Sequence, residues 1–360
     1  MKEQVIKFGP KQAAFEEPFI VEYKTKNGIV SDVFIKLGFL HRGIENLSTK
    51  KNFYQNLGLV ERICGYCSFT HSLAFTQAVE NLAGLTPPKR ALYIRTIVAE
   101  LERLHSHLLW LYLSVEKLGF GEASNYLTQL REGILSLLIK ITGGRIMYEI
   151  NTFGGALKDV GDLSDVEKQT RVYCDVAKRL VNIFEKNRNV YRKTKGIGVL
   201  SRKEAIELGV VGPTARASGI KIDVRKDEPY AAYGELLDKK HTILFGGDVY
   251  SRIYLRFIET AESFETILRA IKNMPEGEIS LPGGRVFIPV GEGIGRVEAP
   301  RGELFHYVKT NSEDYPERVK VRPPTYVNLP ATREMVIGAK REEASMIISS
   351  IDPCFSCTER

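Results

Sequence analysis

Two pairs of cysteines near opposite ends of the chain constrain its fold most strongly. Cys64 and Cys67 form one pair, Cys354 and Cys357 form the other, and two residues separate the thiols within each pair. Two thiols at this spacing can bind one metal ion or form a redox-active dithiol, and two such pairs can supply four thiolates. If the pairs act together, the fold must bring two distant parts of a 360-residue chain into contact.

Spacing alone leaves several interpretations of these pairs open. Structural zinc sites usually draw cysteine pairs from neighbouring loops, roughly 12 to 20 residues apart. A thioredoxin-like dithiol would need a βαβ unit, which the pattern lacks, and would leave the second pair unexplained. A structural four-cysteine site that ties the chain ends together, an iron-sulfur cluster and a softer transition metal all remain compatible with four thiolates. The fifth cysteine, Cys174, is expected to be a small core residue.

The composition is that of an ordinary soluble globular protein, with 43% hydrophobic and 26% charged residues. The net charge of +7 is spread along the chain without an interleaved aromatic and basic motif, so we expect no nucleic-acid partner. The first residues lack the apolar segment of a signal peptide, and no apolar run reaches the roughly 20 residues that span a bilayer. Close cysteine pairs in such a chain indicate a reducing, cytoplasmic setting.

Hydrophobic spacing predicts a short β region followed by long helices. Segments 19–23 and 29–35 are rich in β-formers and flank Asn27-Gly28, a dipeptide that favours a hairpin turn. From residue 68 onwards the apolar residues follow helical spacing. Ser164 is the expected N-cap of one helix, with Glu167 at the capping-box position. The expected helices cover residues 91–118, 124–141, 164–193 and 248–273.

The last third of the sequence changes character. Residues 277–301 are rich in glycine and proline, and short strands are expected at 303–310 and 318–322. A last helix is expected near 332–349, ending before Asp352-Pro353. The predicted fold is therefore mainly α with small β elements (α+β), built on a bundle of long helices. We interpret 1–360 as one domain with a hairpin region (1–60), a helical bundle (61–275) and a C-terminal β region with a metal-binding tail (276–360).

A glycine-rich run at residues 291–295 raises the question of nucleotide binding. No strand-to-helix turn is expected after it, because Glu298-Ala299-Pro300 would break the required helix, so we expect no nucleotide cofactor. The glycines would instead let the backbone approach a metal pocket. His41, His241 and His306 have no evident partners in the sequence and are expected to be structural.

Taken together, the motifs resemble the large subunit of nickel-iron hydrogenases. The segment Glu61-Arg62-Ile63-Cys64-Gly65-Tyr66-Cys67 with His71, and the segment Asp352-Pro353-Cys354-Phe355-Ser356-Cys357, are similar to the two signature motifs of that family. Three further blocks occur in family order: His41-Arg42-Gly43-Ile44-Glu45, Glu298-Ala299-Pro300-Arg301-Gly302 and Pro323-Pro324-Thr325. The resemblance therefore covers essentially the whole chain.

The similarity is strongest for the membrane-associated, energy-converting branch, which is related to the quinone-site subunit of respiratory complex I. Gly9-Pro10 ahead of Glu16-Glu17-Pro18 is similar to this branch, and so is the segment 101–109. Complex I subunits of this kind lack the four metal-binding cysteines. Because this chain has all four, the resemblance implies a metal site.

The resemblance implies a nickel-iron centre whose iron carries carbon monoxide and cyanide. Cys64 and Cys354 would be terminal ligands of nickel, and Cys67 and Cys357 would bridge nickel to iron. Soft thiolates hold nickel and allow redox change. Dihydrogen would then be split or formed heterolytically, with the proton on a base.

The implied catalytic residues are Cys354 as the first base, Glu17 as the next proton acceptor and Arg301 held over the open site. A carboxylate can take a proton from a thiol within hydrogen-bond reach. The sequence leaves open whether Glu16 or Glu17 fills this place, although the following proline favours Glu17. A solvated acidic pair in a loop is the alternative.

The same resemblance assigns supporting residues. His71 would hydrogen-bond a bridging cysteine, and Thr325 with the backbone near Pro300 would face the cyanide ligands. Arg62, with the glutamate before it, and Asp352 would orient the cysteine loops. Considered alone, His71 could equally be a packing histidine, and Arg62 could simply form an ion pair with its neighbour.

Two positions depart from the family pattern. Many hydrogenases end the second motif with a histidine that binds magnesium or iron together with a glutamate matching Glu45. Here the corresponding residue is Arg360, and we predict that its guanidinium replaces the cation and pairs with Glu45. A tail without fixed contacts is the alternative. The second departure is Ser106, where many relatives carry an aspartate.

The implied activity is reversible reduction of protons to dihydrogen with electrons from reduced ferredoxin. The sequence has no further cysteine cluster, so a separate iron-sulfur small subunit is expected to deliver the electrons. Further hydrophilic and integral membrane subunits would couple the reaction to ion translocation and hold the chain at the cytoplasmic side of the membrane. The alternative is a complex-I-like structural subunit whose four cysteines hold zinc and which has no hydrogenase activity.

Overall fold

The computed structural model describes residues 3–11, 16–311 and 314–360; Met1 and Lys2, which begin the segment without a signal-peptide pattern, lie outside these ranges. The strands are β1 (Glu3–Phe8), β2 (Ile20–Lys26), β3 (Ile29–Lys36), β4 (Asn151–Thr152), β5 (Gly155–Ala156), β6 (Gly291–Ala299), β7 (Gly302–Thr310) and β8 (Pro316–Arg322). The helices are α1 (Ile44–Ser48), α2 (Phe53–Glu61), α3 (Ser68–Ala83), α4 (Lys89–Lys117), α5 (Gly121–Thr142), α6 (Ser164–Lys186), α7 (Arg188–Thr194), α8 (Arg202–Glu207), α9 (Gly212–Ala217), α10 (Val224–Asp227), α11 (Tyr233–Leu236), α12 (Val249–Asn273), α13 (Pro324–Asn328), α14 (Ala331–Val336), the 3-10 helix η1 (Arg341–Glu343), α15 (Ala344–Ser349) and α16 (Phe355–Glu359).

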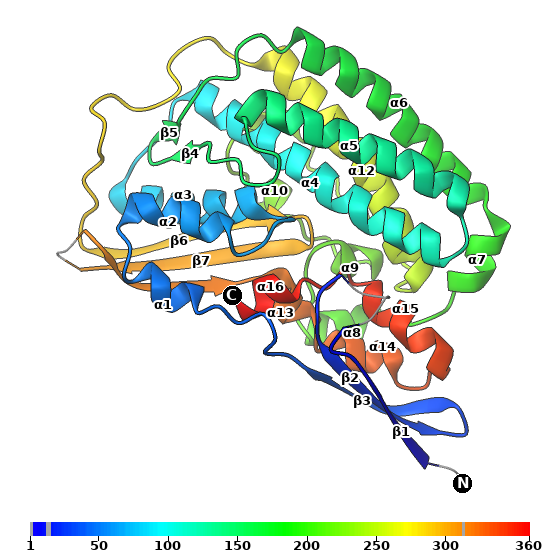
Figure 1. The fold of residues 1–360 in the computed structure, drawn as a ribbon. Helices are drawn as coiled ribbons and strands as arrows, with labels where there is room; N and C mark the ends of the chain where they lie inside the picture. Colours follow the sequence, from blue (N-terminus) through cyan, green and yellow to red (C-terminus); the bar gives the residue numbers. More distant parts are fainter. Residues whose placement is uncertain (1–2, 12–15, 312–313) are drawn as a thin grey trace.

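Long helices form the core of the molecule, as the sequence pattern predicts (Figure 1). Helix α12 packs against α4 and α6, and α5 packs against α4. Helix α4 is buried on nearly every face from Ala91 to Leu111, because other helices surround it. The mainly α fold with small β elements is confirmed. Among the described helices, none has the length and apolar character needed to cross a bilayer.

The predicted N-terminal hairpin is present and belongs to a three-stranded antiparallel sheet with the order β1-β2-β3. Asn27 (φ 51°) and Gly28 (φ 80°) both adopt left-handed backbone conformations in the turn between β2 and β3, as the dipeptide predicts. The sequence pattern did not indicate β1, which covers the outer edge of this sheet. Strand β3 joins the sheet to the C-terminal elements, since Val30 N–H donates to the carbonyl of Ala339 at 2.9 Å.

A second antiparallel sheet, β6-β7-β8, carries helix α3 on one face (Figure 1). A Cβ atom at Gly293 would lie 2.0 Å from the carbonyl oxygen of Ala78, and one at Gly295 would lie 1.8 Å from that of Ala74. These glycines therefore let the backbone of α3 lie directly on the sheet. The expectation that the glycine-rich run approaches the metal pocket is wrong, because its close contact is with α3.

Three local helix predictions are wrong. The expected last helix, 332–349, ends at Val336, because Gly338 adopts a left-handed backbone (φ 85°) before η1 and α15 resume. The expected helix 164–193 is divided at Asn187, whose side chain caps α7. Ser164 is not an N-cap either, since its hydroxyl donates to Asp162 Oδ2 at 2.8 Å and Leu163 occupies the capping position.

A buried ion pair joins α3 to α4. Arg95 donates to both carboxylate oxygens of Glu80 at 2.7 and 2.9 Å, and Arg95 also donates to carbonyls of the β4–β5 hairpin. Replacing Arg95 with methionine would leave a buried carboxylate without its cation. We expect Arg95→Met to lower the free energy of unfolding by about 3–5 kcal/mol in urea denaturation. The exposed Arg171–Glu167 pair provides the control, and an Arg171→Met chain with an equal loss would contradict this account.

Candidate metal centre

The four predicted cysteine ligands converge at one buried point. Cys64 Sγ lies 3.3 Å from Cys354 Sγ, and Cys67 Sγ lies 3.3 Å from Cys357 Sγ. The sulfur atoms of Cys354 and Cys357 are 3.0 Å apart. All four side chains are buried and none forms a disulfide. Four sulfurs at these separations are arranged to share metal ligation.

The first cysteine loop joins α2 to α3 and is held by two buried carboxylates. Glu61 accepts hydrogen bonds from the N–H groups of Tyr148 and Glu149, at 3.1 Å each for the nearer oxygens. Glu102 of α4 accepts from Thr70 N–H at 2.9 Å, at the start of α3 immediately after Cys67. Burial raises the pKa of both Glu61 and Glu102 to about 7. Glu102 thus caps a helix that lacks its own capping side chain.

The Arg62 side chain contacts the end of α2 and Glu149. Its guanidinium donates to Glu149 Oε1 at 2.8 Å and to the carbonyl of Gly58 at 2.6 Å, and half of the side chain is exposed. The simple alternative, an ion pair between Arg62 and Glu61, is therefore wrong: the partner is Glu149. Arg62 supports the end of α2 rather than touching the cysteines.

Four buried side chains donate hydrogen bonds to the turn before the second cysteine pair. Each of the successive residues 349–352 accepts a hydrogen bond from one of them. The bonds run from Trp110 Nε1 to Ser349 O (2.9 Å), from Arg252 Nε to Ser350 Oγ (2.7 Å), from Arg256 Nη2 to Ile351 O (3.4 Å) and from Arg301 Nε to Asp352 O (2.9 Å). Helices α4 and α12 therefore fix the position from which Cys354 approaches the centre.

One arginine ties the two cysteine loops together. Arg42 donates to the carbonyls of Arg62 and Ile63, both at 2.7 Å, and to the carbonyl of Ser356 at 3.0 Å. The planar guanidinium fork suits this triple contact, which a single ammonium group cannot reproduce. Arg42 thus bridges two loops that lie near opposite ends of the chain.

We expect Arg42→Lys to weaken metal retention by about 10-fold to 100-fold, because the two loops lose their shared donor. The measurement is metal content per chain after challenge with a graded series of chelator concentrations. Arg62→Lys is the matched control, since the described hydrogen-bond partners of the Arg62 side chain are the Gly58 carbonyl and Glu149. Equal metal retention in Arg42→Lys and wild-type chains would contradict the bridging role.

Glu17, the predicted proton acceptor, lies beside Cys354. The Cys354 sulfur is 3.9 Å from Glu17 Oε1, while Glu17 Oε2 accepts from the backbone N–H groups of Phe355 and Ser356. Burial raises the pKa of Glu17, and so does the negative charge of Cys64; the hydrogen bonds offset only part of this rise. Glu16 is exposed and has no comparable contact with a cysteine sulfur among the described interactions. The geometry therefore favours Glu17 over Glu16.

Arg301 is buried between the cysteine loop and α4. It forms an ion pair with Asp352 at 2.7 Å and donates to the Ser106 hydroxyl at 2.8 Å. Arg256 adds a second cation 4.0 Å from the Asp352 carboxylate. Ser106, where the resemblance led us to expect an aspartate, thus contributes a neutral acceptor that holds Arg301 in place.

His71 makes the predicted contact with a cysteine and a second contact that the sequence did not indicate. His71 Nε2 lies 3.4 Å from Cys357 Sγ, and His71 Nδ1 lies 3.0 Å from Nε2 of His306. Burial lowers the pKa of His71 to about 4, so the ring is neutral. The expectation that His306 has no partner is therefore wrong.

A small cavity adjoins the cysteines. The hydroxyl oxygen of Thr325 accepts from Cys354 N–H at 3.0 Å, which leaves the Thr325 hydroxyl proton available to a neighbour. Pro300, which has no backbone N–H, also lines the cavity. The full lining consists of Cys67, His71, Ala299, Pro300, Arg301, Leu304, Pro324, Thr325, Cys354 and Cys357.

The cysteine cluster fits a bound metal centre on grounds of charge. Hydrogen bonds from the Cys354, Cys357 and Cys67 thiols, together with the Arg301 charge, hold the pKa of Cys64 well below its ordinary value. Burial raises the pKa of Cys357 well above its ordinary value. The cluster alone thus stabilises one thiolate, and only a cation among the sulfurs would stabilise all four. Soft sulfur donors suit nickel, iron and zinc.

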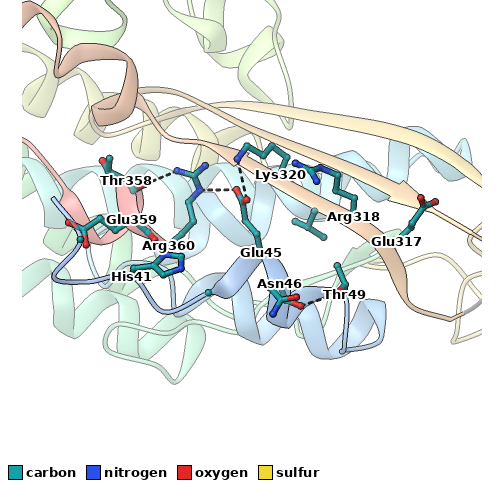
Figure 2. Close-up of a pocket in the computed structure, with 13 residues that line it drawn as sticks. His41, Glu45, Asn46, Thr49, Glu317, Arg318, Lys320, Thr358, Glu359 and Arg360 are labelled. Carbon is teal, nitrogen blue, oxygen red and sulfur yellow. Dashed lines mark hydrogen bonds and ion pairs between the residues drawn. The ribbon is translucent and has the colours of Figure 1, made fainter.

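The predicted contact between Glu45 and the C-terminal residue is present. Arg360 Nε donates to Glu45 Oε1 at 2.8 Å, and the Lys320 ammonium lies 3.2 Å from Glu45 Oε2 (Figure 2). Burial acts to raise the pKa of Glu45, but the Val321 N–H and the Arg360 guanidinium hold it below its ordinary value. Two cationic side chains, Arg360 and Lys320, contact the Glu45 carboxylate, as expected if Arg360 takes the place of a metal ion. That replacement stays a prediction, and a divalent cation bound at Glu45 would contradict it.

Comparison with known proteins places the chain in a family. The family model described as respiratory-chain NADH dehydrogenase, 49 Kd subunit, matches residues 118–287 and 283–360. The model described as nickel-dependent hydrogenase matches residues 42–120, which include the first cysteine pair. Together the two matches extend over most of the chain.

Individual relatives agree with these matches. The carbon monoxide-induced hydrogenase of Rhodospirillum rubrum is 37% identical over 100% of both chains, and the membrane-bound hydrogenase subunit alpha of Pyrococcus furiosus is 38% identical over 99% of this chain and 87% of its own. One chain of the F(420)H(2) dehydrogenase of Methanosarcina mazei is 35% identical over 99% of this chain and 98% of its own.

A solved structure extends the likeness to the whole fold. A chain of the membrane-bound sulfane sulfur reductase, described as an archaeal respiratory membrane complex, has a TM-score of 0.93 and 31% identity, and the match covers 99% of this chain and 98% of that one. The similarity thus spans the bundle, both larger sheets and the cysteine loops. The chain belongs to the family that contains the large subunits of membrane-bound hydrogenases and the related 49-kDa subunits of complex I.

Proposed function

We propose that this chain is the catalytic subunit of an energy-converting nickel-iron hydrogenase. It would reduce protons to dihydrogen reversibly, with electrons from reduced ferredoxin that reach it through an iron-sulfur small subunit. Membrane subunits would couple this reaction to ion translocation and hold the chain at the cytoplasmic side of the membrane. The names of the hydrogenase relatives support the activity class, and their membrane-bound description supports the membrane complex.

The convergence of four buried thiols beside a carboxylate and a guanidinium carries this proposal. Cys64, Cys67, Cys354 and Cys357 would together hold the nickel-iron centre. When bound, a nickel-iron centre supplies a soft, redox-active metal pair at which dihydrogen is split or formed. A structural zinc site would need the four thiols but would not need a proton acceptor beside one of them.

The proton route begins at the Cys354 sulfur. Glu17 Oε1, at 3.9 Å from that sulfur, would accept the proton, and a small movement of the carboxyl group would bring the two atoms within hydrogen-bond reach. The raised pKa of Glu17 brings its proton affinity closer to that of a thiol, which favours reversible transfer in both directions. The backbone bonds to Glu17 Oε2 hold the carboxyl group in place while Oε1 exchanges the proton.

The cavity wall would hold the remaining ligands of the iron. The Thr325 hydroxyl and the backbone around Pro300 would contact the bound centre, and Arg301 would place its charge beside it. The buried ion pair of Arg301 with Asp352 keeps the guanidinium from rotating away. His71 would donate to the bridging Cys357 sulfur.

Electrons would have to come from another subunit. Within the described ranges, the remaining cysteine, Cys174, is buried in α6 and belongs to no cysteine cluster. A separate iron-sulfur subunit is therefore part of the proposal.

Isotope exchange between dihydrogen and deuterated water tests the proposed chemistry without a ferredoxin supply. The purified complex is expected to form HD and to evolve dihydrogen when reduced ferredoxin is added. A complex that binds zinc in the four-cysteine site and forms no HD would establish the alternative, a complex-I-like structural subunit. HD formation without dihydrogen evolution from reduced ferredoxin would support the catalytic site and contradict only ferredoxin as the electron donor.

A further inference from the structure

A second histidine, His306, contacts His71, and the proposed chemistry gives it no role. His306 lies on β7, and its Nε2 is 3.0 Å from Nδ1 of His71. Both rings are fully buried, with their centroids 5.3 Å apart. The other ring nitrogen of His306, Nδ1, is buried without a hydrogen-bond partner among the described residues. Within the described part of the chain, the polar group that the His306 ring contacts is therefore His71.

The glycine-rich strand makes this histidine contact possible. Gly295 on β6 lies directly opposite His306 on β7 in the sheet register. Because Gly295 has no side chain, α3 rests on the sheet with the Ala74 carbonyl where a Cβ atom would otherwise lie. His71 is one turn of α3 before Ala74, and it therefore reaches the side chain of His306. The run at 291–295 thus contributes to the metal centre through α3.

In the hydrogen-bonded series His306–His71–Cys357, only one tautomer of each ring lets His71 donate to a metal-bound thiolate. A thiolate sulfur is an acceptor, so His71 Nε2 must carry a proton to donate to it. A neutral imidazole then has a bare Nδ1, which must accept a proton from a neighbour. His306 Nε2 is the described atom in position to donate that proton. With the opposite tautomers, the His71 Nε2 lone pair would face the negative sulfur.

We propose that His306 is a positioning residue of the metal centre: its Nε2–H donates to His71 Nδ1 and thereby fixes the tautomer in which His71 Nε2–H donates to Cys357. The inference rests on the proposed function only in requiring a metal-bound thiolate at Cys357. The His71 ring cannot turn over without breaking its bond to His306, because α3 and β7 are packed against each other. His306 acts on the metal ligand through His71 and touches no sulfur itself.

Nitrogen NMR of the purified, metal-loaded complex with ¹⁵N-labelled histidine tests this tautomer directly. In a diamagnetic state, His71 is expected to show a protonated Nε2 and an unprotonated Nδ1, assigned by the signals lost in His71→Gln. His306 is expected to show a protonated Nε2. A His71 ring protonated at Nδ1 would overturn the proposal. This test depends only on a metal-bound thiolate, so it decides the point even if the metal proves to be zinc.

Infrared spectra of variants give a second readout. Loss of an N–H···S bond leaves more electron density on the thiolate, so the iron-bound carbonyl band is expected to move to lower wavenumber. His306→Leu, His71→Leu and the double variant are expected to share the same shift, and His306→Gln, whose amide can donate, is expected to retain the wild-type band. An unshifted His306→Leu beside a shifted His71→Leu would overturn the proposal. A wild-type complex without carbonyl and cyanide bands would instead contradict the proposed function, and the NMR result would then decide the role of His306.

Discussion

A Cys357→Ser chain is expected to lose the metal centre and all hydrogen turnover. The Cys357 sulfur lies inside the cluster, 3.0 Å from Cys354 Sγ, 3.3 Å from Cys67 Sγ and 3.4 Å from His71 Nε2. A serine hydroxyl is a hard donor that stays protonated near neutral pH and would not replace the soft thiolate proposed for this position. Elemental analysis by mass spectrometry is expected to show nickel and iron in wild-type chains and only background levels in the variant.

Cys174→Ser is the matched control for this experiment. Cys174 is buried in α6, outside the cysteine cluster, so its replacement is expected to leave metal content and hydrogen turnover unchanged. A Cys357→Ser chain that keeps its nickel and iron would contradict the ligand assignment. Thermal melting of both variants separates loss of metal from loss of fold.

Glu17→Gln is expected to lower the rate of hydrogen turnover by about 10²-fold to 10⁴-fold while the metals stay bound. The glutamine side-chain oxygen can still accept from the N–H groups of Phe355 and Ser356, so the second cysteine loop keeps its support. A glutamine amide cannot take the proton from Cys354. The measurements are HD formation and metal content on the same sample.

Glu16→Gln provides the control for the neighbouring carboxylate. Glu16 is exposed, whereas Glu17 is partly buried beside Cys354, so only a modest change is expected in the Glu16 variant. A fully active Glu17→Gln chain together with an inactive Glu16→Gln chain would make Glu16, and not Glu17, the proton acceptor. Unchanged rates in both variants would contradict a carboxylate relay.

Local sequence signals predicted most of the fold. The Asn27-Gly28 turn and the long apolar periodicities identified the hairpin and the main helices, because turn chemistry and amphipathic spacing are local properties. The prediction failed where tertiary structure decides a local break. Apolar residues on both sides of Gly338 suggested one helix, but that glycine turns the chain so that Gly338 N–H and the Ala339 carbonyl bond to Val30 on β3.

The cysteine spacing and the resemblance predicted which cysteines would meet as ligands, but not the residues that hold their loops. Arg42 contacts backbone carbonyls of two distant loops, and Glu102 caps a helix from another helix. His306 meets His71 across 235 residues of sequence. Contacts to backbone groups leave no side-chain pattern in a single sequence, and a lone buried histidine has no partner until the fold is known.

The contact of Arg360 with Glu45 was predictable because the resemblance places a cation beside Glu45, and Arg360 supplies a planar, permanently charged donor at the matching position. Charge complementarity between two named positions can be inferred without coordinates, whereas distances cannot. Lys320, the second cation on Glu45, lies on β8 and had no motif to indicate it.

Infrared spectroscopy of the purified complex, with metal analysis of the same sample, tests the central claim most directly. The account predicts nickel and iron in equal amounts in the four-cysteine site and absorption bands from metal-bound carbon monoxide and cyanide. These bands are expected to disappear in Cys357→Ser and to persist in Cys174→Ser. Zinc in place of nickel and iron, with no carbonyl or cyanide bands in the wild-type complex, would contradict the assignment of this chain as a hydrogenase catalytic subunit.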